Sequence, residues 1–392
     1  MDALEPARLG PIGLRNRVLK AATFEGMSPG GVASPALVGL HERLAKGGVG
    51  LTTVAYCAVD PSGRTFPDQL QLAGSEPTLR ELTARVHDAG GAASLQLAHA
   101  GFFSKLRGPD GRGPRGPSWA LNAYGASAGL PITRPMTEGD VARVIDAFGA
   151  AAEQAVALGF DAVEVHLGHG YLLSQFLSPA TNRRRDRWGG SLERRLALPL
   201  AVLARVRAAV GAERAVIAKT NLDDGFPDGL GIDDAIRIAQ AIDARGDVDL
   251  LVPSGGFTSR TPFFLLRGGL PLARMADAQP DALARIGMRV LGRAIVRAYP
   301  FEESFFLPLA RRLRASVQMP VALLGGLVSR EGLAEARREG FDFVVLGRAL
   351  IADPELVARM ARGELERTRC DACNECVVEM DRGGVRCVLD DA

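Results

Sequence analysis

The chain has 392 residues, of which 47% are hydrophobic and 23% charged, and its formal net charge at pH 7 is +2. This composition is typical of a globular protein that buries a large core. No cluster of Lys and Arg is long enough to indicate a nucleic-acid surface, and no apolar stretch is long enough to predict a membrane span. The first residues lack a basic region followed by an apolar run, so we expect no signal peptide and a cytoplasmic location.

Short apolar runs alternate with amphipathic segments along the chain. Most runs are nearly continuous in apolar residues, which is typical of strands buried on both faces of a sheet. Between them, Asp140–Leu158 carries an apolar stripe with helical spacing, and Ser34-Pro35 is typical of a helix start. Eight runs are predicted to be strands: Arg17–Thr23, Val49–Tyr56, Ala92–His99, Asp161–Leu167, Ala215–Asn221, Asp249–Ser254, Pro320–Leu324 and Phe341–Leu346.

Eight strand–helix units in order indicate parallel strands with right-handed crossovers. We therefore predict the α/β class and a single (β/α)8 TIM barrel, because these units account for nearly the whole chain. An open doubly wound sheet would need a Gly-rich turn after the first strand, which residues 22–31 do not supply. Extended loops after strands three and six, Phe102–Met136 and Phe257–Pro300, are expected to shape the barrel mouth. The barrel is expected to occupy residues 1–369, followed by a Cys-rich tail at 370–392.

Three polar aromatic side chains follow one another at the end of the fourth predicted strand: His166, His169 and Tyr171. His166 alternates with apolar neighbours, so its side chain is expected to point into the barrel. Histidine can donate a hydrogen bond to an oxygen that gains negative charge, and tyrosine can deliver a proton. Because catalytic groups of barrels stand at the C-terminal ends of strands, we predict that these three residues are catalytic. The alternatives are two structural histidines with a core tyrosine, or a zinc site, although no third ligand motif is nearby.

The last two predicted strands end in glycine-containing turns, Gly325-Gly326 and Gly347-Arg348. In barrels, the loops at these positions often hold a phosphate with backbone N–H groups and a helix N-terminus, and glycine permits a close approach. Arg348 adds a fixed positive charge suited to phosphate, and a helix is expected to begin near Asp353-Pro354. Each glycine pair could instead be a simple turn, but together they predict a phosphate site.

Two further polar residues lie within predicted strands. Gln96 needs partners for both its donor and its acceptor, which the pyrimidine edge of a flavin or a neighbouring polar group could provide. Lys219 needs a counter-charge inside a barrel. A reduced flavin could supply that charge, and the alternative is an internal salt bridge with Glu164 or Asp223.

Four of the five cysteines lie near the C-terminus, as Cys370, Cys373, Cys376 and Cys387 in the spacing C-x2-C-x2-C-x10-C. Four thiolates this close can hold an iron–sulfur cluster or zinc. Free thiols without a metal are the alternative. The fifth cysteine, Cys57, is interpreted as a packed thiol.

Taken together, the motifs of the chain resemble those of the old yellow enzyme family of NAD(P)H:flavin oxidoreductases. The resemblance extends over essentially the whole chain, and its most specific part lies between Val163 and Ser191. The matching stretches are Leu9-Gly10-Pro11-Ile12-Gly13-Leu14-Arg15-Asn16-Arg17-Val18, Gln96-Leu97-Ala98-His99-Ala100-Gly101, His169-Gly170-Tyr171-Leu172, Gln175-Phe176-Leu177-Ser178-Pro179, Gly189-Gly190-Ser191 and Leu346-Gly347-Arg348-Ala349-Leu350-Ile351-Ala352-Asp353-Pro354.

The resemblance implies that FMN binds in the barrel and that NAD(P)H reduces it before a second substrate is reduced. It implies that His166 and His169 bind the oxygen of that substrate. It also implies that Tyr171 protonates a carbon atom of the substrate. Flavin contacts are implied for a larger set of residues: Ala22, Thr23, Gln96, Lys219, Gly325, Gly326, Gly347 and Arg348. Phe24 stands where many members carry a Thr or Cys that tunes the flavin. The cysteine tail resembles the 2,4-dienoyl-CoA reductase and trimethylamine dehydrogenase branch, which carries a [4Fe–4S] cluster.

The expected function is the reduction of activated C=C bonds, such as α,β-unsaturated carbonyl compounds, by a ping-pong cycle. The alternative in the same fold is oxidative N-demethylation of small methylated amines, which the likeness of the tail keeps open. A flavin-free lyase or aldolase would need a catalytic lysine or metal-binding carboxylates at the strand ends, and Lys219 is the one candidate. The partner is expected to be a small molecule rather than a nucleic acid or a membrane. A homo-oligomer is compatible with the sequence.

Overall fold

The computed structural model describes residues 2–278 and 282–389. Within these residues, eight parallel strands form one sheet in the spatial order β11-β10-β9-β5-β4-β3-β13-β12. Seven of the predicted runs contain one strand each, and the eighth, Val49–Tyr56, overlaps β4, which extends two residues further. The strands are β3 (Val18–Lys20), β4 (Leu51–Ala58), β5 (Ala92–Ala98), β9 (Ala162–Leu167), β10 (Ala215–Asn221), β11 (Leu250–Ser254), β12 (Ala322–Leu324) and β13 (Phe343–Leu346).

The two ends of the sheet meet and close a barrel. Leu251 in β11 pairs in parallel with Val321, directly before β12, and its N–H donates to Pro320 O at 3.0 Å. All residues of β9 and β10 are buried, as expected of barrel strands covered on both faces. The prediction of a (β/α)8 TIM barrel is therefore confirmed.

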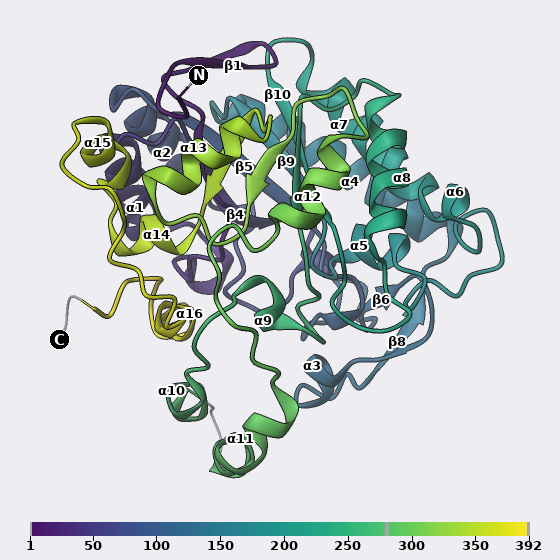
Figure 1. Ribbon diagram of the computed structural model, residues 1–392. Coiled ribbons are helices and arrows are strands. Elements are labelled where there is room, and N and C mark those ends of the chain that lie inside the picture. Colours follow the sequence, from purple (N-terminus) through teal and green to yellow (C-terminus); the bar gives the residue numbers. More distant parts are fainter. Residues whose placement is uncertain (1, 279–281, 390–392) are drawn as a thin grey trace.

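Helices surround the barrel (Figure 1). The predicted helix at 140–158 is α4 (Glu138–Ala157), which begins with a capping box between Thr137 and Asp140 and buries Val141, Val144 and Phe148. The other principal helices are α1 (Pro35–Lys46), α2 (Glu76–Asp88), α7 (Ala197–Val210), α8 (Ile232–Asp243), α12 (Leu307–Arg314), α13 (Arg330–Arg338), α14 (Arg348–Ala352) and α15 (Leu356–Ala361).

Additional elements lie at the two ends of the barrel. The hairpin of β1 (Ala7–Leu9) and β2 (Ile12–Leu14) is at the top of Figure 1, near the start of β11, where Gly10 approaches Asp249 so closely that a side chain would collide. The two long loops lie at the opposite end, where the strands terminate (Figure 1). The loops contain η3 (Gly101–Phe103), β6 (Arg115–Gly116), β7 (Ala120–Leu121), α3 (Ala123–Ala126) and β8 (Ile132–Pro135) after β5, and α9 (Pro262–Leu265), α10 (Leu272–Asp277) and α11 (Ala282–Ile295) after β11.

The C-terminal segment packs against the barrel. It contains α16 (Glu375–Glu379), and Val385 belongs to the hydrophobic core with Cys376 and Met380 packed beside it. The N–H of Val385 donates to Glu25 O at 2.7 Å, which fixes the segment beside the loop after β3. The expected boundary at residue 369 stays a prediction.

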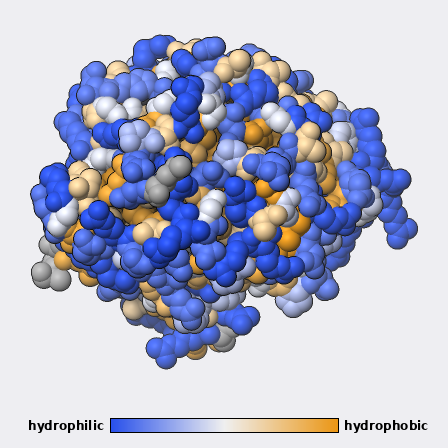
Figure 2. Space-filling view, turned by 45° about the horizontal axis from the view of Figure 1, so that its top comes forward, coloured by the Kyte–Doolittle hydropathy of each residue, from blue (hydrophilic) through white to orange (hydrophobic). Residues whose placement is uncertain are grey.

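Polar side chains cover most of the face shown in Figure 2, with apolar side chains visible in patches between them. Among the described residues, no helix is both long and apolar enough to cross a membrane.

Candidate functional site

A pocket opens at the C-terminal ends of the barrel strands. It brings together residues that are far apart in the sequence, because parallel strands deliver their C-terminal ends to one face. The lining includes most residues for which the sequence predicts a flavin contact: Ala22, Thr23, Lys219, Gly325, Gly326, Gly347 and Arg348. Of the predicted catalytic residues, His169 lines it and His166 and Tyr171 do not. Gln96, the remaining predicted flavin contact, is also outside the lining.

The glycines give this pocket a backbone wall. Gly325 and Gly326 have φ angles of 131° and 78°, and a Cβ at either would collide with Phe306 or Phe305. A Cβ at Gly347 would extend into open space, with its nearest neighbour, Thr23 Cγ2, 3.8 Å away. No side chain therefore stands between the pocket and the backbone at Gly347, so a phosphate could approach the backbone closely there.

The helix beside this wall differs from the sequence-based expectation. We expected a helix to begin near Asp353-Pro354, but α14 begins at Arg348, directly after Gly347, and the next helix begins at Leu356. Asp353 instead forms a turn, in which its Oδ1 accepts from Glu355 N at 3.0 Å. The short α14 therefore begins directly at the glycine wall.

Arg348 is positioned by the two segments that cover the pocket. Its Nη1 donates to Arg267 O at 2.9 Å and also bonds to Asn374 Oδ1 in the tail. Burial lowers the pKa of its guanidinium. Among the described residues no carboxylate pairs with Arg348, so its charge is available to an anionic group such as a phosphate.

Polar groups at the floor of the pocket are only partly satisfied. Thr23 Oγ1 is buried and has no hydrogen-bond partner within the protein. Such a group normally finds a partner, which FMN would provide. Lys219 Nζ lies 2.8 Å from Glu164 Oε1, so the internal salt bridge considered for it is present even though Lys219 also lines the pocket. Gln96 Nε2 donates to the same carboxylate oxygen at 2.6 Å.

The two predicted catalytic histidines are adjacent, with ring centres 4.9 Å apart. The N–H of Gly168 donates to His166 Nδ1 at 3.4 Å, which places the ring proton of neutral His166 on Nε2. His169 Nε2 lies 2.7 Å from Ser254 Oγ. Burial, with contributions from the Lys219 charge, lowers the pKa of His169 to about 3 and that of His166 well below its usual value. Both rings are therefore neutral near pH 7 and can donate through N–H.

Tyr171 completes the cluster, with its ring centre 4.5 Å from that of His166. Its ring also packs edge-on against Tyr56, 5.0 Å away, and Phe103, 5.1 Å away. Burial and the neighbouring Tyr56 raise the pKa of Tyr171 well above its usual value. Tyr171 therefore stays protonated and can serve as a proton donor. The sequence did not identify Tyr56 as its neighbour, because Tyr56 lies within β4 and Tyr171 follows β9, far along the chain.

A buried network beneath the pocket escaped sequence reasoning. Glu25 forms an ion pair with Lys20, accepts from Ala55 N at 3.1 Å and lies 3.5 Å from His41 Nε2. Lys20 also donates to Thr53 O at 2.9 Å. The network anchors the segment that carries Thr23. In the sequence, only the charged residues Lys20 and Glu25 within a mainly apolar stretch indicated this network.

The four tail cysteines are neighbours, but the structure does not arrange them as a metal site. In the described part of the chain, no group of three or more His, Cys, Asp or Glu side chains could hold a metal ion. Burial raises the pKa of the Cys376 thiol to about 12. Cys370 lines the pocket, and Cys57 is buried with its thiol pKa raised by desolvation. We therefore assign no step to a metal.

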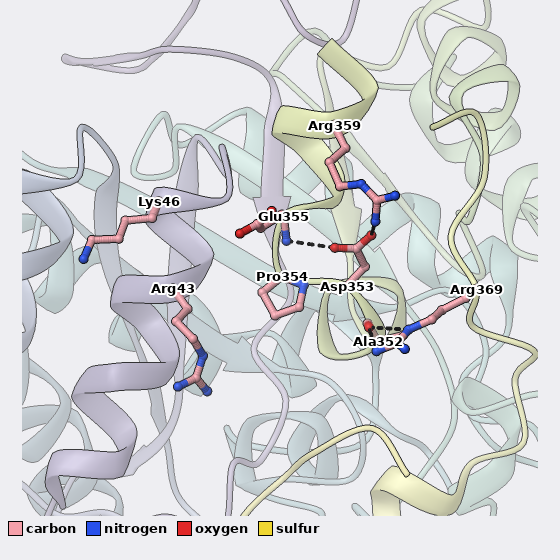
Figure 3. Close-up of a pocket in the computed structure, with 8 residues that line it drawn as sticks. All are labelled: Arg43, Lys46, Ala352, Asp353, Pro354, Glu355, Arg359 and Arg369. Carbon is pink, nitrogen blue, oxygen red and sulfur yellow. Dashed lines mark hydrogen bonds and ion pairs between the residues drawn. The ribbon is translucent and has the colours of Figure 1, made fainter. Parts of the chain in front are cut away.

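A second pocket, on the outside of the barrel, has a different character. Its charged groups come from α1 and from the segment around α15, and Figure 3 shows Arg43 and Lys46 pointing away from the other residues. Arg359 pairs with Asp353 at 2.7 Å, and Lys46 pairs with Glu42 at 2.7 Å. Because several of its charges are paired and its basic side chains do not converge, we place the functional site at the barrel mouth instead.

The barrel mouth thus combines a glycine-lined pocket with a neutral His–His–Tyr cluster. Residues 3–252 match the NADH:flavin oxidoreductase / NADH oxidase family. The chain is 42% identical over 389 residues to the 4,4'-dithiodibutanoate disulfide reductase of Rhodococcus erythropolis, covering 99% of this chain and 95% of the relative. The chain therefore belongs to the NADH:flavin oxidoreductase / NADH oxidase family, within the old yellow enzyme group, and is an NAD(P)H:flavin oxidoreductase.

Two further comparisons define the extent of the likeness. The N,N-dimethylglycine/sarcosine dehydrogenase of Chromohalobacter salexigens is 31% identical over 411 residues, and the match covers 100% of this chain but only 53% of that protein. The old yellow enzyme homologue of Zymomonas mobilis has the same fold, with a TM-score of 0.72, 20% identity, and coverage of 94% of this chain and 95% of that one. The family supports FMN as the cofactor and NAD(P)H as the reductant.

Proposed function

We propose that the protein uses NAD(P)H to reduce activated C=C bonds, such as those of α,β-unsaturated carbonyl compounds. The observation that carries this proposal is the buried cluster of His166, His169 and Tyr171 at the barrel mouth, with ring centres 4.5 and 4.9 Å apart. Two neutral N–H donors beside a protonated phenol suit a substrate that needs its oxygen polarised and one carbon protonated.

Each side chain has a distinct role in this proposal. His166 and His169 hydrogen-bond to the carbonyl oxygen, so that negative charge developing on it is stabilised. Tyr171 gives its phenolic proton to the carbon next to the carbonyl. When bound, FMN supplies hydride chemistry between NAD(P)H and the second substrate. Its phosphate would be held by Arg348 and the glycine wall, and its ring system by Thr23 and Lys219. Contacts from Ala22 and, through Glu164, from Gln96 complete the proposed set.

The experiment is an anaerobic acceptor assay. The purified protein, reconstituted with FMN, is reduced with one equivalent of NADH or NADPH and then mixed with 2-cyclohexenone. We expect reoxidation and formation of cyclohexanone. If NAD(P)H reduces the protein but no enone reoxidises it, the C=C assignment is wrong although the flavin oxidoreductase assignment stands.

Disulfide reduction is a second candidate. It is favoured by the 42% identity to a relative named for reducing 4,4'-dithiodibutanoate, which extends over nearly the full length of both chains. In that case the two sulfur atoms of the disulfide would accept the electrons and leave as thiols, and Tyr171 would supply a proton to one of them. Adding 4,4'-dithiodibutanoate to the same assay distinguishes the candidates, because thiols can be counted directly.

Oxidative demethylation of a methylated amine, the alternative kept open by the sequence, uses the same fold. It is supported by the dimethylglycine/sarcosine dehydrogenase relative, of which this chain spans about half. The test is whether dimethylglycine or sarcosine reduces the oxidised protein without NAD(P)H. Metal analysis of the same sample tests the predicted iron–sulfur cluster or zinc at Cys370, Cys373, Cys376 and Cys387.

A further inference from the structure

Two arginines stand at the mouth of the barrel without acidic partners. Arg260 lies in the long loop after β11, and its guanidinium carbon lies 4.7 Å from the ring centre of Phe226 and 5.8 Å from that of Phe257. These aromatic faces hold the guanidinium by cation–π contacts, which leave its N–H donors free.

The aromatic rings connect Arg260 to the proposed catalytic cluster. Phe257 forms a parallel β-bridge with His169, and the N–H of Thr258 donates to His169 O at 2.9 Å. Phe257 also belongs to the same buried aromatic cluster as Tyr171. The ring of Phe257 therefore links Arg260 to His169, one of the residues proposed to bind the substrate.

Arg183 brings a second positive charge to this place. It lies in the segment after α5 (Leu172–Leu177), and its backbone N–H donates to Ser118 Oγ at 2.9 Å. Burial and the charge of Arg183 lower the pKa of Arg260. Arg183 lies in the segment that follows β9 and α5, and Arg260 lies in the loop that follows β11, so both belong to segments at the C-terminal end of the barrel.

No side chain of the described residues neutralises this pair. Neither guanidinium has a hydrogen bond or ion pair with any residue in 2–278 or 282–389. Asp224, the one carboxylate whose charge acts on Arg260, is buried and accepts from Asn221 Nδ2 and Leu230 N, each at 2.8 Å. Two arginines with free donors, in segments beside the proposed catalytic cluster, favour an anionic ligand at the barrel mouth.

We propose that Arg183 and Arg260, here called the rim pair, bind a carboxylate group of the substrate, so that the physiological acceptor is an organic acid. The inference rests on the proposed function, because it assumes that the acceptor reaches the His–His–Tyr cluster. Arginine suits this task since its planar fork matches the two oxygens of a carboxylate.

The test uses two probes with the same reacting enal, 4-carboxycinnamaldehyde and its methyl ester. Their dissociation constants are measured by calorimetry on the oxidised, FMN-loaded protein, so that the result does not depend on turnover. The variants are Arg260→Gln and Arg183→Gln. Arg185→Gln is the matched control, because it removes an exposed arginine from the same segment as Arg183.

We expect the wild-type protein to bind the acid about tenfold more tightly than the ester. Arg260→Gln should remove most of this preference, Arg183→Gln should reduce it, and Arg185→Gln should retain it. Raising the salt concentration should weaken binding of the acid only. An equal affinity for both probes, or a preference that survives both rim variants, overturns the proposal.

Two further readouts separate this proposal from others. If the rim variants weaken NADPH binding instead and leave the acid preference intact, the pair serves the coenzyme phosphate and the carboxylate proposal is overturned. Turnover of the probes is recorded separately. If both bind with the expected preference but neither is reduced, the rim pair stands and the C=C reductase assignment fails.

Discussion

Lys219 and Glu164 form an ion pair inside the barrel, with Nζ and Oε1 2.8 Å apart and side chains only 1% and 5% exposed. Gln96 donates to the same oxygen at 2.6 Å, so one carboxylate connects strands β5, β9 and β10. The charge that lines the pocket floor is thus balanced within the protein. A flavin would meet a lysine whose position is already set.

Replacing Glu164 with Gln should strongly destabilise the protein. The change keeps the shape of the side chain but leaves the Lys219 charge buried without a partner, which costs about 3–5 kcal/mol of the free energy of unfolding. Glu42→Gln is the control, because Glu42 pairs with the 66% exposed Lys46 and should contribute less than about 1 kcal/mol. Urea unfolding of both variants measures the difference. Equal losses would argue against a special role for the buried pair.

Thr23→Val should weaken FMN binding without lowering the thermal stability of the apoprotein. Thr23 Oγ1 is buried and unpartnered within the protein, so valine removes no internal hydrogen bond. We expect the FMN dissociation constant to rise about fivefold, in line with the loss of one hydrogen bond. Fluorescence titration of the apoprotein with FMN measures this, and thermal unfolding of the apoprotein should be unchanged or slightly improved. An unchanged dissociation constant would place Thr23 Oγ1 out of contact with the cofactor.

Tyr171→Phe should affect only one half of the catalytic cycle. Removing the proton donor should slow reoxidation by 2-cyclohexenone about 100-fold or more, while reduction by NAD(P)H changes little. Stopped-flow absorbance follows the two half-reactions separately. Tyr124→Phe, which alters a partly exposed tyrosine of the neighbouring loop, should leave both rates intact. Slowing of both half-reactions to the same extent would indicate a structural role for Tyr171.

His166 should contribute to acid sensitivity. Its pKa is depressed in the folded protein, so the unfolded chain binds the additional proton as the pH falls below about 6.5. The stability contributed by neutral His166 is therefore present above that pH and is lost below it, by about 1.4 kcal/mol per pH unit. His166→Gln should reduce the slope of unfolding free energy against pH by this amount between pH 6 and 5. Parallel slopes for the variant and wild-type protein would contradict the assignment.

The barrel strands were predictable because burial on both faces leaves a local signal, a continuous apolar run. The meeting of the pocket glycines and Arg348 could also be predicted from the sequence, because these residues directly follow the last two strands. The buried partners of these residues were not. Glu25 meets His41 and Arg348 meets Asn374 only because the barrel brings distant segments together. Likewise, no local pattern distinguishes Arg260 from other exposed arginines.

The visible absorption spectrum of the purified, FMN-reconstituted protein, recorded before and after anaerobic addition of NAD(P)H, tests the central claim most directly. We predict flavin absorption bands that bleach when the reductant is added. Any broad additional absorbance beneath them would indicate an iron–sulfur cluster at the tail cysteines. A protein that stays colourless and cannot be loaded with FMN would contradict the assignment of this barrel as a flavin oxidoreductase.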